Sequence, residues 1–324
     1  MPDKHSTRPF DIVMPGQADE AAAVAARTRF GFAGLDRLED DASDLARSAP
    51  RYALAGELAT AMNMAMCVRA PLLVTGEPGT GKTQAAYFLR WLLRIPLFRF
   101  QVRSTSTADE LRWDFDAVSY LHYAQSGAEP KKLRDDPEFL KPRALWRAFD
   151  CTTPSILLID EIDKAPRDFP NDLLRELDER RFTHPFDDKR EIEPRIDGSP
   201  IVIATSNAER RLPDAFLRRC IVHHIELTPD LVAKITGAHS GSFPRLDDAT
   251  RARAIERFLD LRKVEGLSRR PSTAELLAWL AVLSARGTPR SELDKPLSDL
   301  PGLGAIVKDH EDLTVLSSRR AIES

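Results

Sequence analysis

The chain has 324 residues, of which 42% are hydrophobic, and its 47 basic and 50 acidic residues give a net charge of −3. This length and apolar content are enough for two domains with a sizeable core, and so small a net charge excludes a global field that would attract nucleic acid or an anionic membrane. No stretch approaches the roughly 18 apolar residues of a membrane span, and the first residues lack the apolar core of a signal peptide. We therefore expect a cytoplasmic protein.

The three cysteines, Cys67, Cys151 and Cys220, are far apart, and each lies in or beside an apolar segment. This pattern predicts buried, reduced thiols, and it does not favour a metal site or a set of disulfides. The pattern of residues 1–45 is only weakly informative about structure. An alanine-rich piece at 20–27 predicts a helix, and the remainder fits a docking arm or a partly disordered tail equally well.

An eight-residue glycine-rich motif follows a short apolar run at 71–75. It fits the pattern G-x-x-x-x-G-K-[ST] and consists of Gly76, Glu77, Pro78, Gly79, Thr80, Gly81, Lys82 and Thr83. The preceding run is typical of a buried parallel strand, and residues 84–93 carry apolar side chains at helical spacing. Because strand, loop and helix occur in this order, we expect the loop's N–H groups at a helix N-terminus, where they can cradle phosphates. Lys82 would reach the β and γ phosphates of a nucleotide, and the Thr83 hydroxyl would ligate Mg²⁺.

Further elements surround this motif. Apolar residues at helical spacing predict a helix at 52–68, and alternation predicts a strand at 97–102. Thr107 and Glu110 have the spacing of a capping box for a short helix, and residues 140–150 predict another helix. These elements alternate as they do in an α/β fold.

Two segments between these helices do not follow a regular pattern. Residues 113–125 break helical spacing and place aromatic side chains between charges, which predicts an inserted hairpin or loop with exposed aromatics. Residues 131–134 form a small basic run. We interpret that run as a solvated loop.

A second feature with chemical significance is the run of four apolar residues at 156–159, which is followed by Asp160 and Glu161. The run predicts a buried strand whose carboxyl end emerges beside the phosphate loop. Asp160 would hold hydrated Mg²⁺, a cation that prefers oxygen ligands. Glu161 would orient and deprotonate the attacking water. By itself such an ending is often a strand reaching solvent, but the complete phosphate loop upstream favours the catalytic interpretation.

Next, the sequence predicts a helix at 170–180, a β-hairpin at 181–193 and a buried strand at 200–206 that ends in Asn207. The Asn207 amide could hydrogen-bond the γ-phosphate or the water. An asparagine that closes a strand is more often a turn residue, so this role depends on alignment with Asp160 at the same sheet edge.

A short apolar helix ending in Arg218 and Arg219 precedes a strand at 221–227. Arginines at a helix end commonly form surface ion pairs. His223 and His224 are adjacent on the strand, so they point to opposite faces and cannot chelate one metal together.

After Pro229 the strand patterns stop, and Ser272 and Glu275 have the spacing of a capping box. Helical patterns occupy residues 230–236, 248–264 and 273–285. The proline-rich segment from 287 onward predicts loops and one more helix. The sequence thus predicts four parts, namely an N-terminal extension (1–45), an α/β nucleotide-binding domain (46–228), an α-helical lid domain (229–286) and a C-terminal tail (287–324).

Together, the motifs over residues 50–285 resemble those of the AAA+ ATPases, and most closely the MoxR-type branch. The resemblance implies an α/β, three-layer P-loop domain with a parallel sheet of strand order 5-1-4-3-2, followed by a small all-α lid. It also implies that 113–125 holds an insert in helix 2, that 182–193 is a presensor hairpin, and that both face a central pore.

The resemblance assigns roles to several residues. Asn207 would be sensor 1, and Arg219, with Arg218 beside it, would be the arginine finger that reaches a neighbouring subunit's ATP and stabilises transition-state charge. At sensor 2 the chain departs from the family, because Ala274 stands where related chains often carry arginine. Arg270 or Arg269 would then take over the contact with the nucleotide.

The function implied is hydrolysis of ATP with Mg²⁺ by a homo-oligomeric ring, expected to be a hexamer. Such a ring would remodel or activate a partner protein, which in this family often bears a von Willebrand A domain. The alternative is an ATP-dependent scaffold or signalling switch with little turnover. A nucleic-acid motor is disfavoured because the chain lacks a basic recognition segment.

Overall fold

A computed structural model describes residues 11–15, 19–36, 38, 43–52, 54–125 and 139–323. The basic run 131–134 lies outside the described residues, as do the first ten. The chain divides into two compact units. The first unit consists of Met1–Pro50, Leu54–Gly76 and Lys82–Ile225, and the second of Arg51–Ala53, Glu77–Gly81 and Glu226–Ser324.

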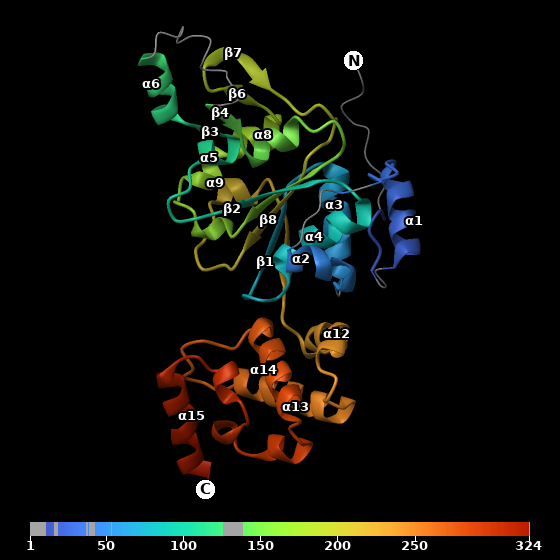
Figure 1. Cartoon of the computed structure of the whole chain (residues 1–324), viewed down its shortest axis with the longest axis vertical. Coiled ribbons are helices and arrows are strands. Elements are labelled where there is room, and N and C mark those ends of the chain that lie inside the picture. Colours follow the sequence, from blue (N-terminus) through green and yellow to red (C-terminus); the bar gives the residue numbers. More distant parts are fainter. Residues whose placement is uncertain are drawn as a thin grey trace. The chain divides into compact units, whose positions relative to one another are not determined.

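A parallel sheet in the order β2-β5-β8-β1-β9 forms the centre of the first unit (Figure 1). Its strands are β1 (Leu72–Gly76), β2 (Leu97–Gln101), β5 (Ile156–Asp160), β8 (Ile201–Ser206) and β9 (Ile221–Ile225). Numbered one to five along the chain, they have the order 5-1-4-3-2, so the expected α/β topology is confirmed. β5 and β8 are buried along their whole length, as parallel strands covered on both faces should be.

Helices cover both faces of this sheet (Figure 1). The helices in this part of the chain include α1 (Glu20–Phe30), α2 (Asp44–Ser48), α3 (Gly56–Val68), α4 (Lys82–Leu93), α5 (Ala108–Arg112), α8 (Ala144–Phe149), α9 (Phe169–Asp172), α10 (Leu174–Glu179) and α11 (Asp214–Leu217), with the 3₁₀ turns η1 (Ala49–Arg51) and η2 (Ile162–Lys164). On one face, Leu157 and Ile159 pack in one core with Trp146, Phe149 and Phe169. α4 covers the opposite face. This alternation follows from the two-residue period of a strand.

Within the N-terminal extension, α1 is longer than the helix predicted at 20–27. Asp19 caps its first turn by accepting from the Ala22 N–H, and Gly31 ends it in a left-handed conformation. α1 packs against α4, and its buried Arg27 pairs with Glu20. This segment therefore belongs to the first unit.

The segment 113–125 differs from the expected hairpin or loop. It forms a strand, β3 (Trp113–Phe115), and then a helix, α6 (Ala117–Gln125), which Asp116 caps by accepting from the Ser119 N–H at 2.9 Å. The partner strand is β4 (Leu140–Pro142), antiparallel to β3. Because residues 140–142 are used in this pairing, the helix predicted at 140–150 begins only at α8.

The expected exposure of aromatic side chains in this insert is also wrong for Phe115 and Tyr120. Phe115 contacts Phe186 with ring centroids 4.8 Å apart and Tyr120 at 5.3 Å, so both insert aromatics are half-buried. The exposed apolar side chains of α6 are Val118 and Leu121. Phe186 belongs to the predicted hairpin, which is confirmed as β6 (Phe182–His184) and β7 (Asp187–Ile192).

The second unit is helical, with no strand among its described residues. Its elements are α12 (Pro229–Ala238), α13 (Asp248–Arg262), α14 (Thr273–Arg286) and α15 (His310–Glu323), with the short turns η3 (Ser240–Ser242), η4 (Arg290–Asp294), η5 (Leu297–Asp299) and η6 (Leu303–Ala305). The capping box of Ser272 and Glu275 is confirmed at the start of α14. Trp279 and Phe258 lie in a core to which Leu293 and Leu316 also contribute, so residues beyond 287 pack with the three preceding helices. No helix in the described part of the chain is long and apolar enough to cross a membrane.

Candidate active site

The glycine-rich loop between β1 and α4 has the backbone that its sequence predicts. Gly79 and Gly81 have φ values of +80° and +87°, which side chains rarely allow. A Cβ at Gly79 would lie 2.9 Å from the Thr273 Oγ1, and one at Gly81 would lie 3.0 Å from the ring of Tyr52. α4 begins at Lys82, whose buried ammonium donates to the Gly76 carbonyl at 2.8 Å. The loop thus leads directly to a helix N-terminus, as anion binding requires.

Asp160, at the carboxyl end of β5, is a buried carboxylate with only 2% of its surface exposed. Its Oδ1 accepts from the hydroxyls of Thr83 at 2.8 Å and Thr205 at 2.6 Å. Its Oδ2 accepts from the Arg99 guanidinium at 2.6 and 3.1 Å. Four donated hydrogen bonds, two of them from a cation, offset the cost of burying this charge.

Glu161 follows in a left-handed conformation, with φ of +61°. This is uncommon for a residue with a side chain, and such conformations are concentrated at functional sites. Its N–H donates to the Thr205 Oγ1 at 2.8 Å. Its Oε2 accepts from the Gln101 amide at 2.6 Å and from the Lys164 ammonium at 2.7 Å. The hydrogen bond to Glu161 raises the pKa of Lys164 above its ordinary value.

The donors at this edge fit a hydrated magnesium ion. The Thr83 hydroxyl and the Asp160 carboxylate share a hydrogen bond, so two oxygen ligands of the kind that Mg²⁺ prefers converge at the start of α4. In the described residues, no group of three or more His, Cys, Asp or Glu side chains could hold a metal ion. A magnesium ion here would therefore take its other ligands from water and phosphate.

Asn207 lies just beyond β8, and β8 pairs directly with β5, so Asn207 and Asp160 share the same edge of the sheet. Its amide donates to the Glu209 carboxylate at 3.3 Å. The Glu209 N–H in turn donates to the buried Asp163 at 3.0 Å, which fixes the turn after the strand. The predicted alignment with Asp160 is thus present.

The two candidate finger arginines at the end of α11 differ in their contacts. Arg219 donates to the Asp178 carboxylate at 2.5 Å and to the Ala215 carbonyl at 2.8 Å. Arg218 is exposed and makes no side-chain hydrogen bond or ion pair with any residue that the structure describes. Of the two guanidinium groups, that of Arg218 is the one available to another molecule.

In the second unit, the lid arginines expected at sensor 2 are not the ones that touch the loop. Arg269 pairs with Glu275 at 3.5 Å, and Arg270 is exposed. Instead, Arg262 at the end of α13 forms an ion pair with Glu77. Beside it, the Thr273 hydroxyl donates to the Gly79 carbonyl. Sequence reasoning missed Arg262, because no motif surrounds it.

Sequence reasoning also missed Arg99, Gln101 and Thr205. A signal was available, since Gln101 is the residue paired with Asp160 in the parallel register of β2 and β5. Arg99 lies two residues earlier and therefore on the same face of the sheet. Thr205 occupies the matching end of β8.

The site combines three features: a glycine-rich loop before a helix, the pair Asp160 and Glu161 at the end of β5, and Asn207 just beyond β8, which is the strand between β1 and β5. Together these features define a P-loop nucleotide-binding domain. Residues 71–220 match the family model described as an AAA domain of the dynein-related subfamily. Residues 71–220 therefore form an AAA ATPase domain, and membership of this family implies ATP binding. The AAA+ resemblance that the sequence motifs indicated is confirmed.

Two other comparisons add less. A protein from Cytophaga hutchinsonii ATCC 33406, described provisionally as an ATPase in its crystal structure at 2.00 Å resolution, is similar at 14% identity over 86% of this chain and 91% of that chain, with a TM-score of 0.41. Among curated proteins, none matches the sequence.

Proposed function

We propose that the protein is an ATP-hydrolysing AAA+ ring of the MoxR type, expected to be a hexamer, that remodels or activates a partner protein. One observation carries the proposal. Thr83, Asp160, Thr205 and Glu161 form a continuous chain of hydrogen bonds at the edge of the sheet where the glycine-rich loop begins. These hydrogen bonds hold Thr83 at the start of α4 and the two acidic residues at the end of β5 close together, which supports a shared role in binding Mg²⁺ and activating water.

Some of these residues would bind the nucleotide and Mg²⁺, and Glu161 would accept a proton. Lys82 and the loop N–H groups would hold the phosphates, and Thr83 and Asp160 would hold Mg²⁺, which neutralises phosphate charge when bound. Glu161 would orient a water and accept its proton while the water oxygen bonds to the γ-phosphorus and the bond to ADP breaks. The products are ADP and phosphate. The Asn207 amide would hydrogen-bond the water or the γ-phosphate.

An arginine from a neighbouring subunit would stabilise the charge of the transition state and so contribute about 10³–10⁵ in rate. The exposed, unengaged Arg218 supports this role for α11, and Arg219 could join it after leaving Asp178. Hydrolysis then requires assembly of a homo-oligomer. The exposed apolar side chains Val118 (79%) and Leu121 (58%) on α6 support contact of the insert with a protein client, such as one with a von Willebrand A domain.

A second candidate, an ATP-dependent switch with little turnover, is favoured by one feature of the site. The Glu161 Oε2 accepts hydrogen bonds from both Gln101 and Lys164, and the Asp160 Oδ2 accepts one from Arg99. Carboxylates held in this way are less available for water and metal. Turnover at saturating ATP separates the two candidates, because a passive switch should not gain specific activity as the protein concentration rises.

The test compares two variants by calorimetric ATP binding and by phosphate release. Lys82→Ala should abolish binding, whereas Glu161→Gln should bind ATP and not turn it over. The matched controls are Lys189→Ala and Glu193→Gln, which change exposed residues outside the site. Normal hydrolysis by Glu161→Gln would remove Glu161 from the role of base, and normal ATP binding by Lys82→Ala would remove the glycine-rich loop from the role of phosphate site.

A further inference from the structure

The outer edge of β2 presents main-chain groups that pair with no described residue. β2 is the last strand of the sheet and pairs with β5 on one side. The Ile156 N–H donates to the Pro96 carbonyl at 2.8 Å, and the Val102 N–H donates to the Asp160 carbonyl at 3.0 Å. Because main-chain groups alternate in direction along a strand, those of Leu97, Arg99 and Gln101 face outward. An unpaired strand edge of this kind is a template for another strand.

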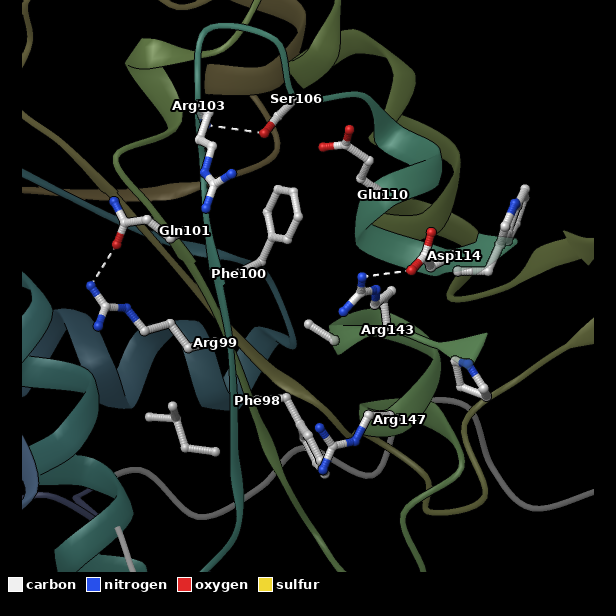
Figure 2. A pocket seen from close by; sticks show the side chains of 14 residues that line it. Phe98, Arg99, Phe100, Gln101, Arg103, Ser106, Glu110, Asp114, Arg143 and Arg147 are labelled. Atoms are coloured by element: carbon white, nitrogen blue, oxygen red, sulfur yellow. Dashed lines mark hydrogen bonds and ion pairs between the residues drawn. The ribbon is translucent and has the colours of Figure 1, made fainter. Parts of the chain in front are cut away.

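A cavity of about 610 Å³ runs along this edge (Figure 2). One wall is β2 itself, and the others come from α5, β3, β4 and α8. The rings of Phe98 and Phe100, both half-buried, line the same wall. The volume lies within the range of ligand-binding pockets, and its combination of apolar rings with a free backbone suits an extended chain.

Cationic side chains outnumber carboxylates around the cavity. The charged residues that line it are Arg99, Arg103, Arg143, Arg147, Glu110 and Asp114. Arg143 forms an ion pair with Asp114 at 2.7 Å, and Arg99 forms one with Asp160. Arg147 lies over the Phe98 ring, with its guanidinium carbon 5.0 Å from the ring centroid. Among the described residues, neither Arg103 nor Arg147 has a carboxylate partner (Figure 2). Both side chains are exposed.

We propose that this β2 edge cavity is a docking site for an extended acidic segment of a partner protein, which pairs with β2 as a sixth strand. The alternating N–H and C=O groups of the edge would supply affinity, and Arg103 and Arg147 would select carboxylates. An oligonucleotide has no main-chain groups at strand spacing, so the free edge favours a peptide over a nucleic acid. The site goes beyond the proposed ATPase function and does not depend on hydrolysis.

The probe is a random heptapeptide library displayed on phage and selected on the full-length protein. The selected peptides are then synthesised with a fluorophore, and their affinities are measured by anisotropy. We expect enrichment of Asp and Glu alternating with apolar residues. The double variant Arg103→Glu/Arg147→Glu should weaken binding by about 10- to 100-fold, because charge-assisted hydrogen bonds are lost and like charges introduced. Arg190→Glu, which changes an exposed arginine on β7, is the matched control and should leave the affinity unchanged.

A second pair of variants tests the strand edge itself. Leu97→Pro removes an N–H that points outward and does not pair with β5, so the sheet should tolerate it. Peptide binding should be lost with Leu97→Pro and kept with Leu97→Ala, which retains the N–H. Bound peptide should also slow hydrogen exchange of the Arg99 and Gln101 amides.

Several results would overturn the docking site. One is a selection that yields no binder, and another is a set of selected peptides without acidic enrichment. A third is a peptide affinity that changes neither in Arg103→Glu/Arg147→Glu nor in Leu97→Pro. Displacement of the peptide by single-stranded RNA or DNA would point to a nucleic-acid site. Loss of self-association in Leu97→Pro, with peptide binding intact, would assign the edge to a second copy of this chain.

Discussion

Thr205 is the residue whose removal tests most sharply how the two acidic residues of the site are held. Its hydroxyl is fully buried, donates to the Asp160 Oδ1 at 2.6 Å and accepts from the Glu161 N–H at 2.8 Å. Thr205→Val keeps the shape of the side chain and removes both hydrogen bonds. The valine leaves a main-chain N–H without an acceptor and a buried carboxylate with one donor fewer.

The magnitude follows from these two losses. A hydrogen bond to a charged group contributes about 1.5–3 kcal/mol, and an unsatisfied buried donor costs about 1–3 kcal/mol. The two losses sum to about 2.5–6 kcal/mol. Because Asp160 keeps its bonds from Thr83 and Arg99 and Glu161 is only half-buried, we expect Thr205→Val to lower the free energy of unfolding by about 2.5–4 kcal/mol, the lower part of that range. Thr205→Ser keeps the hydroxyl and loses one methyl group, which should cost about 1 kcal/mol.

Guanidinium denaturation of the first unit's transition measures the stability, and phosphate release measures turnover. Because Glu161 loses its main-chain anchor, turnover of Thr205→Val should fall by about 10- to 100-fold, a barrier increase of about 1.4–2.7 kcal/mol. Thr205→Ser should remain near the unmodified protein in turnover. If valine and serine gave the same stability within about 0.5 kcal/mol and the same turnover, the hydrogen-bonded chain would not be what positions the acidic residues.

Three further outcomes follow from half-buried groups of the first unit. The Arg180 guanidinium donates to the carbonyls of Arg69, Ser199 and Pro200. Arg180→Met should therefore lower the free energy of unfolding by about 2–4 kcal/mol in denaturant titrations. A loss below about 0.5 kcal/mol would contradict this. Burial lowers the pKa of His223 in the folded protein, so the stability it contributes is present above its ordinary pKa of about 6.5 and is lost as the pH falls below that value through the lowered pKa. The thermal midpoint should therefore drop as the pH falls below about 6.5, and His223→Gln should flatten the drop; an equal slope in both proteins would exclude His223 as a source. Burial raises the pKa of Cys220 to about 12, so iodoacetamide followed by mass spectrometry should label it far more slowly in the native than in the denatured protein, and equal rates would refute its burial.

The sequence predicted those parts of the fold in which local chemistry decides the structure. The glycine-rich loop required a strand before it and a helix after it, and β1 and α4 are present. Ser272 and Glu275 predicted the start of α14 to the residue, because a capping box is satisfied within one turn. The placement of Asp160 at the loop followed from the parallel order of the strands, which brings their carboxyl ends to one edge.

What could not be predicted depends on pairings between distant residues. β3 and β4 pair Phe115 with Leu140, so no local pattern in 113–125 shows that the segment starts with a strand. Arg99 and Gln101 face the acidic residues only through the register of β2 against β5. Arg262 and Glu77 are 185 residues apart in the sequence, and an isolated arginine near a helix end carries no signal of such a contact.

The measurement that bears most directly on the proposed shared active site is ATP turnover in mixed oligomers. Lys82→Ala removes the phosphate contact of the subunit that holds the nucleotide, and the double variant Arg218→Ala/Arg219→Ala removes the finger offered to a neighbour. Each should be inactive alone. If one chain binds ATP and the next completes the site, mixing the two should restore turnover well above either parent, because some interfaces combine an intact loop with an intact finger. No gain in activity, with mixed particles demonstrated by native mass spectrometry, would contradict a site built from two copies of this chain.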